Sequence, residues 1–241
     1  MIPHATDGAA PGTGDPLASR DDRHARRRWQ AACLATLSVL AVLTVAAATV
    51  GVLPGDPELR LALVALATPD VVALARVVNP GGSWVVLLPG MLVVFALSPD
   101  VRRRWWLWSA VFVGGALVEQ ALKSGLARAR PEDVSAGFPS GHATSAAVFA
   151  MIILYAASRS RLSPRARAAV AAAALAGACL VGLARIELRA HWPSDVVAGW
   201  ALGAGLAAGA AWWSLSAGAA APARARRDLA AARPDPRAAR G

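Results

Sequence analysis

The sequence predicts an all-α, polytopic membrane protein built as a bundle of six transmembrane helices. Hydrophobic residues make up 56% of its 241 residues and charged residues only 17%. Six apolar stretches reach or approach the ~20 helical residues that cross a hydrocarbon core. Arginine clusters flank several of these stretches, as membrane topology requires. The formal charge of +10 therefore follows from topology, and we expect no nucleic-acid partner.

The chain begins with a basic segment, residues 1–28, that we expect to be a disordered cytoplasmic tail. Residues 1–19 are rich in Gly, Pro, Ala and Asp without periodicity. The apolar run that follows, residues 29–53, could be a signal peptide, and an adjacent arginine pair weakly resembles a twin-arginine export signal. Because this run exceeds the ~7–15 apolar residues of a cleaved signal, we favour a retained first span.

Residues 57–78 are apolar overall but are not predicted to cross the membrane. Pro69 and Asp70 interrupt their centre, and in lipid a proline removes a backbone donor while an aspartate is costly. We interpret the segment as an interfacial or re-entrant helical piece that ends in the turn at residues 79–82. The remaining spans are expected at residues 83–97, 105–122, 143–158, 168–184 and 196–216.

The distribution of basic residues predicts the orientation of these spans. With the N-terminus inside, 18 of the 25 Lys and Arg residues fall in inner segments. One of these segments is residues 217–241, which we expect to be a disordered cytoplasmic tail. If residues 57–78 crossed, two of the strongest arginine clusters would lie outside. The sequence thus predicts an integral cell (inner) membrane protein with both termini in the cytoplasm.

Most of the outer cations belong to three polar blocks at the ends of apolar stretches, which places these blocks on the extracytoplasmic face. The blocks are Lys123 with Arg130-Pro131, then Pro139-Ser140-Gly141-His142, then Arg185 with His191 and Asp195. Each cation alone is typical of a snorkelling residue at a span end, and Ser140 alone is typical of a helix N-cap. Together, three cations and the N–H groups of a helix start favour a phosphate site.

The two histidines in these blocks suit phosphoryl transfer. His191 and Asp195 are four residues apart, so the carboxylate can bind one ring nitrogen and leave the other as a nucleophile, although such a pair could also merely cap a helix. His142 would protonate the departing alkoxide and later activate water. Positioning and charge compensation dominate this chemistry, so we expect no metal or other cofactor. The acidic pair Glu132-Asp133 is interpreted as a solvated loop.

In this order the blocks resemble the type 2 phosphatidic acid phosphatase superfamily of integral membrane lipid phosphatases. The resemblance covers residues 123–203 and implies that residues 29–216 form a six-span phosphatase domain with an outward-facing, metal-independent site. It implies phosphate binding by Lys123, Arg130, Ser140, Gly141 and Arg185, acid catalysis by His142, nucleophilic attack by His191, and orientation of the nucleophile by Asp195.

Two positions depart from the pattern of this superfamily. Ala184 stands where a serine is usual, which removes a hydroxyl near the phosphate. Arg189 stands where a glycine is common, and we hypothesise that this extra cation at the rim favours a diphosphate or an acidic headgroup.

The sequence therefore predicts a lipid phosphatase that hydrolyses a phosphate monoester or diphosphate through a phosphohistidine. Phosphatidic acid, phosphatidylglycerol phosphate and a polyprenyl diphosphate are the candidate substrates. A lipid phosphotransferase with the same site remains an alternative. The complete His–His–Asp set disfavours a non-catalytic anion-binding or transport protein, and the spans disfavour the related soluble haloperoxidases. The sequence does not indicate the oligomeric state.

Two further features accompany the blocks. Glu119 lies four residues before Lys123 on the same helix face, where it either orients the lysine or satisfies a charge near a span end. The last span carries glycines at small-xxx-small spacings, and we expect them to pack within the bundle rather than at a dimer interface. They are Gly199, Gly203, Gly205 and Gly209.

Overall fold

A computed structural model describes the backbone of residues 16–231 and the side chains of residues 22–217. Regular structure in this range is helical, which confirms the all-α class, and one isolated bridge pairs Ala129 with Ala136. The elements are α1 (Pro16–Val50), α2 (Asp56–Ala65), α3 (Pro69–Val78), the 3₁₀ turn η1 (Asn79–Gly82), α4 (Trp84–Leu97), α5 (Pro99–Arg102), α6 (Trp105–Leu126), α7 (Gly141–Arg159), α8 (Pro164–Glu187) and α9 (Pro193–Ala231).

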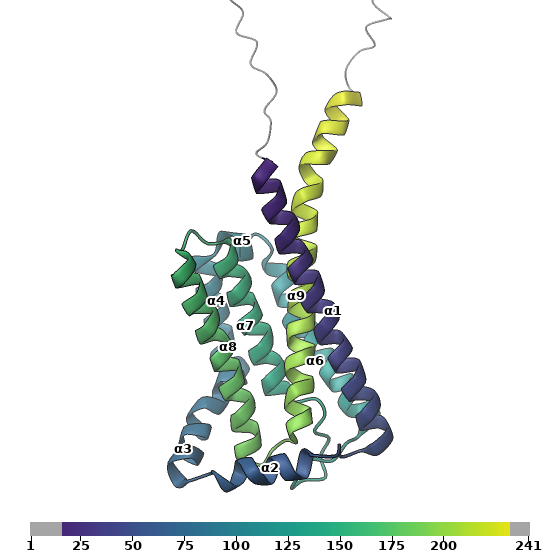
Figure 1. The fold of residues 1–241 in the computed structure, drawn as a ribbon, viewed down its shortest axis with the longest axis vertical. Coiled ribbons are helices and arrows are strands. Elements are labelled where there is room, and N and C mark those ends of the chain that lie inside the picture. Colours follow the sequence, from purple (N-terminus) through teal and green to yellow (C-terminus); the bar gives the residue numbers. More distant parts are fainter. Residues whose placement is uncertain (1–15, 232–241) are drawn as a thin grey trace, which may run out of the picture.

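Six of these helices match the six stretches that were predicted to span. The long helices run along the length of the molecule, whereas α2 lies across one end (Figure 1). Four segments combine the length and apolarity of a span, and these are Asp22–Val50, Gly141–Arg159, Pro164–Glu187 and Pro193–Ala217. By contrast, α4 has only 14 residues, and Glu119 and Gln120 make α6 less apolar. Length and apolarity thus support four spans, or five if α2 and α3 cross as one bent unit.

Two helices extend into segments for which we expected disorder. Helix α1 already begins at Pro16, within the basic segment 1–28, and α9 continues to Ala231, into the tail at residues 217–241. Alanine and arginine are strong helix formers, and extending an existing helix needs no new nucleus. The rest of both predicted tails, residues 1–15 and 232–241, lies outside the described residues.

The segment 57–78 forms two helices, α2 and α3, and the chain bends by 111° between them. Thr68 caps the second helix, since its Oγ1 accepts a hydrogen bond from the N–H of Val71 at 3.3 Å, and Pro69 occupies the first turn. The proline and aspartate that interrupt the apolar pattern therefore begin a new helix. The bent helical piece and its closing turn η1 agree with the sequence prediction.

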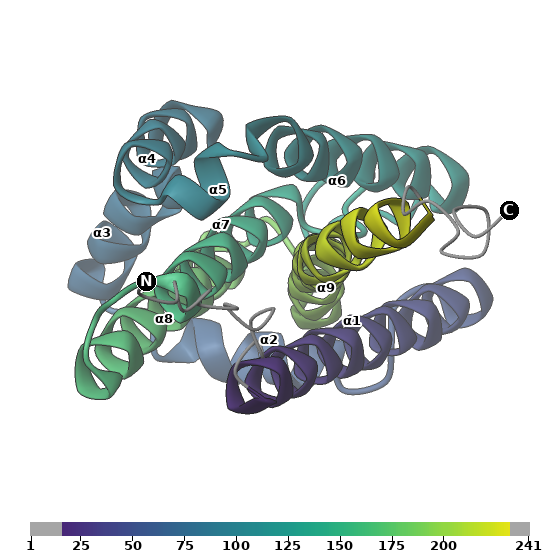
Figure 2. The same ribbon diagram turned by 90° about the horizontal axis from the view of Figure 1, so that it is seen from above.

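Small residues bring α7 and α9 into close contact in the middle of the bundle (Figure 2). A Cβ atom at Gly199 would lie 2.5 Å from the carbonyl oxygen of Ser140, and one at Gly203 would overlap the carbonyl oxygen of Thr144. The two later glycines of the series face side chains of α1 in the same way. The glycines thus pack within the bundle, as predicted.

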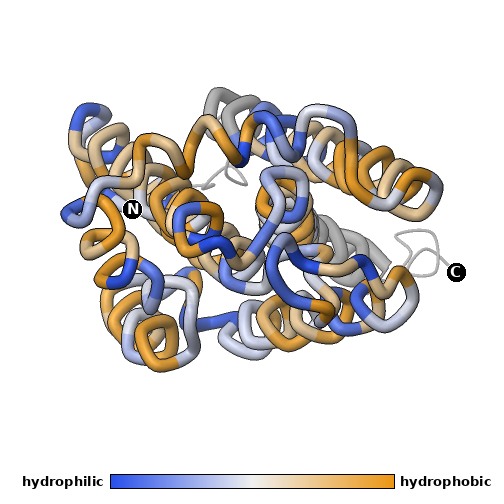
Figure 3. Tube along the Cα trace, turned by 90° about the horizontal axis from the view of Figure 1, so that it is seen from below, coloured by the Kyte–Doolittle hydropathy of each residue, from blue (hydrophilic) through white to orange (hydrophobic). Residues whose placement is uncertain are grey.

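The outer faces of the helices carry large apolar side chains. Val42 and Leu92, for example, are 69% and 68% exposed. Seen from the α2 end, the helices are mostly apolar and many of the polar residues gather in the connecting loops (Figure 3). Such a surface suits hydrocarbon rather than water, so the polar loops lie where a membrane boundary is expected.

The contact between α7 and α9 can be tested with matched glycine substitutions. We expect Gly203→Ala to lower the free energy of unfolding by about 1–3 kcal/mol because the methyl group overpacks the backbone of α7. A Cβ atom at Gly114 in α6 meets no atom within 4 Å, so Gly114→Ala should be neutral or stabilising by about 0.5–1 kcal/mol. Thermal unfolding in detergent measures both, and equal midpoints would contradict this packing.

Candidate active site

The three polar blocks meet at the α2 end of the bundle. Helices α6 and α8 end here, whereas α7 and α9 begin here (Figure 1). Their termini therefore bring together residues that are more than sixty positions apart in the chain. The groups whose charges act on His142 are Arg185, His191, Lys123 and Arg130. Every block thus contributes to one site.

Ser140 stands at the N-cap position of α7, as the sequence predicts, but its hydroxyl does not cap the helix. Its backbone N–H instead donates to the carbonyl oxygen of Asp195 at 2.9 Å. The side chain is fully buried, and its Oγ has no hydrogen-bond partner among the described side chains and backbone groups. Both this hydroxyl and the first N–H groups of α7 can therefore bind an anion.

Glu119 forms an ion pair with Lys123 and lies against the start of α7. A Cβ atom at Gly141 would lie 2.6 Å from Oε2 of Glu119, so this approach requires a glycine. The carboxylate is favourable at the positive end of a helix. Of the two roles considered for Glu119, this geometry supports orientation of Lys123 beside the N-terminus of α7.

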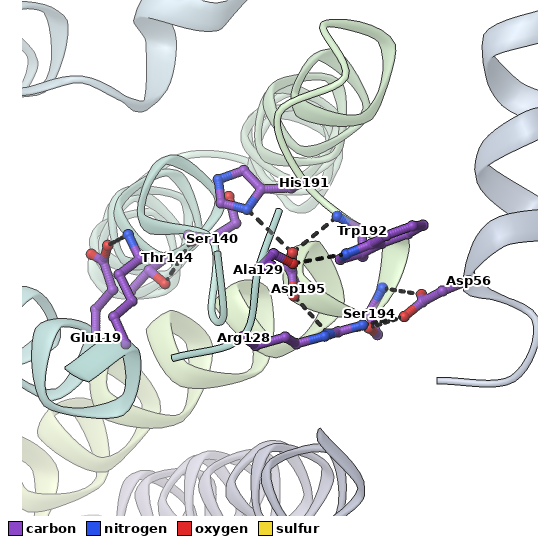
Figure 4. A network of polar contacts seen from close by, with 11 residues as sticks. Asp56, Glu119, Arg128, Ala129, Ser140, Thr144, His191, Trp192, Ser194 and Asp195 are labelled. Atoms are coloured by element: carbon purple, nitrogen blue, oxygen red, sulfur yellow. Dashed lines mark hydrogen bonds and ion pairs between the residues drawn. The ribbon is translucent and has the colours of Figure 1, made fainter. Parts of the chain in front are cut away.

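His191 lies between α8 and α9, and Asp195 occupies the first turn of α9. The distance from Nδ1 of His191 to Oδ2 of Asp195 is 3.4 Å, at the long end of the hydrogen-bond range (Figure 4). The same Oδ2 accepts the backbone N–H of Trp192 at 2.9 Å. Both side chains are buried. Because Nδ1 faces the carboxylate, Nε2 is the ring nitrogen that is left for attack.

The surroundings of His191 favour its neutral form. Burial lowers the pKa of this imidazole below its ordinary value of 6.5, and the charges of Arg185 and Arg130 act in the same direction. The hydrogen bond and charge of Asp195 oppose this shift without reversing it. At neutral pH the ring is therefore unprotonated, which is the form that a nucleophile needs.

Arg130 and Arg185 bring positive charge to the site without a carboxylate partner among the described side chains. Arg185 donates from Nη1 to Oδ1 of Asn79 at 2.7 Å. Asn79 belongs to η1, and this turn also packs on His142, since a Cβ atom at Gly82 would lie 2.7 Å from Cβ of His142. Sequence reasoning missed Asn79, and the one available signal was that it is the only asparagine in the chain.

A buried arginine and a second carboxylate lie behind Asp195, and sequence reasoning gave a role to neither. Arg128 binds Oδ1 of Asp195 at 2.7 Å and Oδ2 of Asp56 at 2.6 Å (Figure 4). All three side chains are at least 95% buried. The available signal for Arg128 was its place among the few outer cations. Asp56 gave none, because nothing in the sequence places α2 beside α9.

The two departures from the expected pattern differ in their surroundings. Ala184 is buried in the last part of α8. Arg189 has a φ of 59°, the left-handed conformation that glycine adopts without strain, which explains why a glycine suits this position. Its guanidinium lies 3.5 Å from Glu132, which also pairs with Arg60. Glu132 and Asp133 lie exposed in the loop between α6 and α7, as expected, and Glu132 also forms part of a charged rim.

No group of three or more His, Cys, Asp or Glu side chains is placed to hold a metal ion among the side chains that the structure describes. Beside the carboxylates of Glu119 and Asp195, the site gathers cations, two histidines, a hydroxyl and backbone N–H groups, and these groups can donate hydrogen bonds to an anion.

Comparison with known proteins identifies the family. Residues 90–218, more than half of the chain, match the PAP2 superfamily. The chain belongs to the PAP2 superfamily. Its relatives include phosphatidylglycerophosphatase B of Bacillus subtilis (strain 168), which is 28% identical over 171 residues that cover 67% of this chain and 84% of the relative. The family that the three blocks resemble is therefore confirmed.

Two solved structures share the fold. The crystal structure of the first transmembrane PAP2-type phosphatidylglycerolphosphate phosphatase from Bacillus subtilis has a TM-score of 0.63 and 25% identity, covering 73% of this chain and 92% of that chain. The fold also resembles that of Aquifex aeolicus LpxE, with a TM-score of 0.55 and 18% identity over 69% of this chain and 98% of that chain. With its apolar helices, this PAP2 protein is an integral membrane protein of a phosphatase family.

We predict that His191 titrates below its ordinary value of 6.5 in the folded protein. Carbon-13 NMR of labelled imidazoles in detergent measures this pKa, with His191→Gln to assign the resonance. Arg185→Gln removes a positive charge and should raise the midpoint. A midpoint at or above 6.5, or no response to Arg185→Gln, would contradict the described surroundings.

The same shift predicts the sign of a stability effect. The unfolded chain protonates this ring near pH ~6.5, whereas the folded chain resists protonation. The contribution of His191 to stability is therefore present above that pH and is lost as the pH falls through the lowered folded pKa. When the pH falls, the His191→Gln variant should therefore lose less free energy of unfolding than the wild type.

Proposed function

We propose that this PAP2 protein is a membrane lipid phosphatase that hydrolyses a phosphate monoester or diphosphate of a lipid through a phosphohistidine on His191. The observation that carries the proposal is the meeting of two histidines with Arg130 and Arg185, two cations that lack a carboxylate partner among the described side chains. A phosphate group would supply the missing negative charge. Because Asp195 lies beside His191, the site contains a histidine that a carboxylate can orient. Catalysis needs such a histidine, whereas anion binding alone does not.

In the first half-reaction that we propose, the two histidines have different roles. Nε2 of neutral His191 attacks phosphorus and forms a P–N bond while the P–O bond to the lipid breaks. His142, in its protonated form, gives a proton to the departing oxygen. Asp195 keeps Nδ1 of His191 oriented and stabilises the charge that the ring gains. The products of this step are phosphorylated His191 and the lipid leaving group, which is an alcohol from a monoester and a lipid monophosphate from a diphosphate.

Water completes the second half-reaction. His142, now neutral, takes a proton from a water molecule that attacks phosphorus, and the P–N bond breaks. Phosphate leaves and His191 returns to its neutral state. Lys123, Arg130 and Arg185, the Ser140 hydroxyl and the backbone N–H of Gly141 would bind the equatorial oxygens, where charge must be compensated. These residues can carry each step without a metal ion, so we propose metal-independent turnover.

An apolar groove beside the site supports a lipid substrate. It has a volume of about 560 Å³ and lies between α7 and α8, with lining residues that include Val78, Gly81, Phe149 and Gly177. Gly81 neighbours Gly82, which packs on His142. A hydrocarbon tail in this groove would place its polar end near η1 and therefore near Arg185, which Asn79 of the same turn binds.

The directions of the helices support an outward-facing site on a six-span protein with both termini in the cytoplasm. The site lies at the α2 end, whereas α1 begins and α9 ends at the opposite end (Figure 1). The arginine clusters at 102–104 and 159–167 also lie at that opposite end, because α5 and the α7–α8 connection lie there. Arginine clusters favour the cytoplasmic side.

The names of the relatives suggest phosphatidylglycerol phosphate as one substrate to test first. Phosphatidic acid and polyprenyl diphosphate remain among the proposed substrates because the proposed phosphate-binding residues would bind the phosphate of any of these lipids. Arg189 and Arg60 at the rim are the groups that could distinguish a second phosphate.

Phosphate release from purified protein tests the proposal. We expect activity on a panel of these lipids, unchanged by a chelator, with free phosphate rather than a new phospholipid as the product. His191→Ala should lower kcat at least about 10³-fold, and His142→Ala about 10²–10⁴-fold. Acid-labile phosphate on the wild-type chain after rapid quenching would mark the phosphohistidine. An active His191→Ala variant, or full inhibition by the chelator, would reject the mechanism.

Matched tryptophan substitutions test the groove. A Cβ atom at Gly177 or at Gly114 meets no atom within 4 Å, but only Gly177 lines the groove. Gly177→Trp should lower kcat/KM for a long-chain phosphatidic acid about tenfold, from lost contact with roughly two methylene groups at ~0.8 kcal/mol each. Dioctanoyl phosphatidic acid, whose chains are shorter, should be hydrolysed by Gly177→Trp as by the wild type. Gly114→Trp should hydrolyse both substrates as the wild type does. Equal losses on both substrates would place the tail elsewhere.

A further inference from the structure

We propose that Arg128 and Asp56 are positioning residues that hold Asp195 in the orientation that its partner His191 requires. The inference rests on the roles proposed above for His191 and Asp195. It adds two residues to which sequence reasoning assigned no role: Arg128 lies inside the first polar block, and Asp56 comes from a different part of the chain altogether.

The guanidinium of Arg128 joins two buried carboxylates. Its Nη1 donates to Oδ1 of Asp195 at 2.7 Å and to Oγ of Ser194 at 2.8 Å. Its Nη2 donates to Oδ2 of Asp56 at 2.6 Å. The arginine thus engages one oxygen of Asp195 and leaves Oδ2, the other oxygen, for His191 and the N–H of Trp192. This division of the two oxygens fixes the rotation of the carboxylate (Figure 4).

Asp56 in turn fixes the arginine. Its Oδ1 accepts the N–H of Ser194 at 2.9 Å, and its Oδ2 accepts the hydroxyl of the same serine at 2.5 Å. Asp56 therefore caps the beginning of α9 from a separate helix, α2. The guanidinium of Arg128 also lies over the ring of Phe138, at 5.8 Å from its centroid. With contacts on three sides, the arginine has little freedom to release Asp195.

The charges of the group make its members interdependent. Two carboxylates and one guanidinium, each at least 95% buried, leave one net negative charge, and that charge faces the imidazole of His191. A buried ion pair seldom adds stability over an apolar replacement. Loss of one partner, however, leaves a buried charge uncompensated. The arrangement is therefore better explained by orientation of Asp195 than by stability alone.

Substitutions of the two residues should change the basicity of His191 in opposite directions. The positive charge of Arg128 reduces the effect of the negative charge of Asp195 on His191. The negative charge of Asp56 in turn reduces the effect of Arg128. Arg128→Gln should thus strengthen the effect of Asp195 and raise the pKa of His191, whereas Asp56→Asn should lower it. The other charged or titratable groups that face His191 are Arg185 on α8, Arg130 in the α6–α7 loop and His142 on α7, and they remain unchanged.

The test measures the His191 titration by NMR and the pH dependence of kcat/KM for phosphate release in the full-length chain. We expect opposite shifts of the His191 midpoint in the two variants. In both, kcat should fall about 10- to 100-fold, as for the hydrogen-bond partners of metal-bound histidines. Arg128→Lys keeps the positive charge but loses the two guanidinium nitrogens that bind Asp195 and Asp56 at the same time. It should therefore lower kcat, while the His191 midpoint stays nearer to that of the wild type.

A matched control separates positioning from general destabilisation. Arg104 is a partly buried arginine at the opposite end of the bundle, where it binds the carbonyl and hydroxyl oxygens of Ser214. Arg104→Gln should lower the unfolding midpoint and leave the titration of His191 and kcat/KM unchanged. If Arg128→Gln does not fold, Asp56→Asn and Arg128→Lys decide the question.

Two results would overturn the proposal. The first is a pair of shifts in the same direction, or no shift, in Asp56→Asn and Arg128→Gln. The second is wild-type kcat in a folded Asp56→Asn or Arg128→Lys variant. Neither result bears on the nucleophile, because His191→Ala tests the proposed function separately.

Discussion

The first turns of α7 and α9 touch directly, and the geometry of the site depends on that contact. Glycine at positions 199 and 203 lets the two backbones approach until a Cβ atom would collide with the carbonyl oxygens of α7. At the polar end of this contact the N–H of Ser140 binds the carbonyl oxygen of Asp195. The helix that begins beside His142 is thereby fixed against the helix that follows His191. Bulkier residues would separate the two histidines before they affected either one directly.

Two arginines in one short loop have opposite electrostatic surroundings. Arg128 is buried between two carboxylates, whereas Arg130, two residues later, has no carboxylate partner among the described side chains. We propose different roles for the two arginines: Arg128 holds the protein groups behind the site, and Arg130 offers its charge to the substrate.

Much of this arrangement can be predicted from the sequence, because the three blocks lie at helix ends and such ends must meet at the membrane boundary. The family, the helical class and the bend at Thr68–Pro69 follow from local chemistry. Asn79, Asp56 and the role of Arg128 do not, since each depends on where α2 and η1 pack after folding. Helix also continues beyond Ala217, where low hydrophobicity predicts disorder but alanine and arginine favour helix.

The turn η1 and the first residue of α2 both precede residue 90, where the match to the PAP2 superfamily begins. Asn79 nevertheless binds Arg185, and Asp56 neutralises Arg128. The shared family core therefore does not contain all the partners of its arginines in this chain, because the neighbouring segment supplies a second carboxylate to Arg128 and an amide to Arg185. A transplant of the core alone into another membrane scaffold would keep the pair of Arg128 and Asp195, but it would leave Nη2 of Arg128 and both donors of Ser194 without an acceptor, and the new host would have to provide one in the place of Asp56.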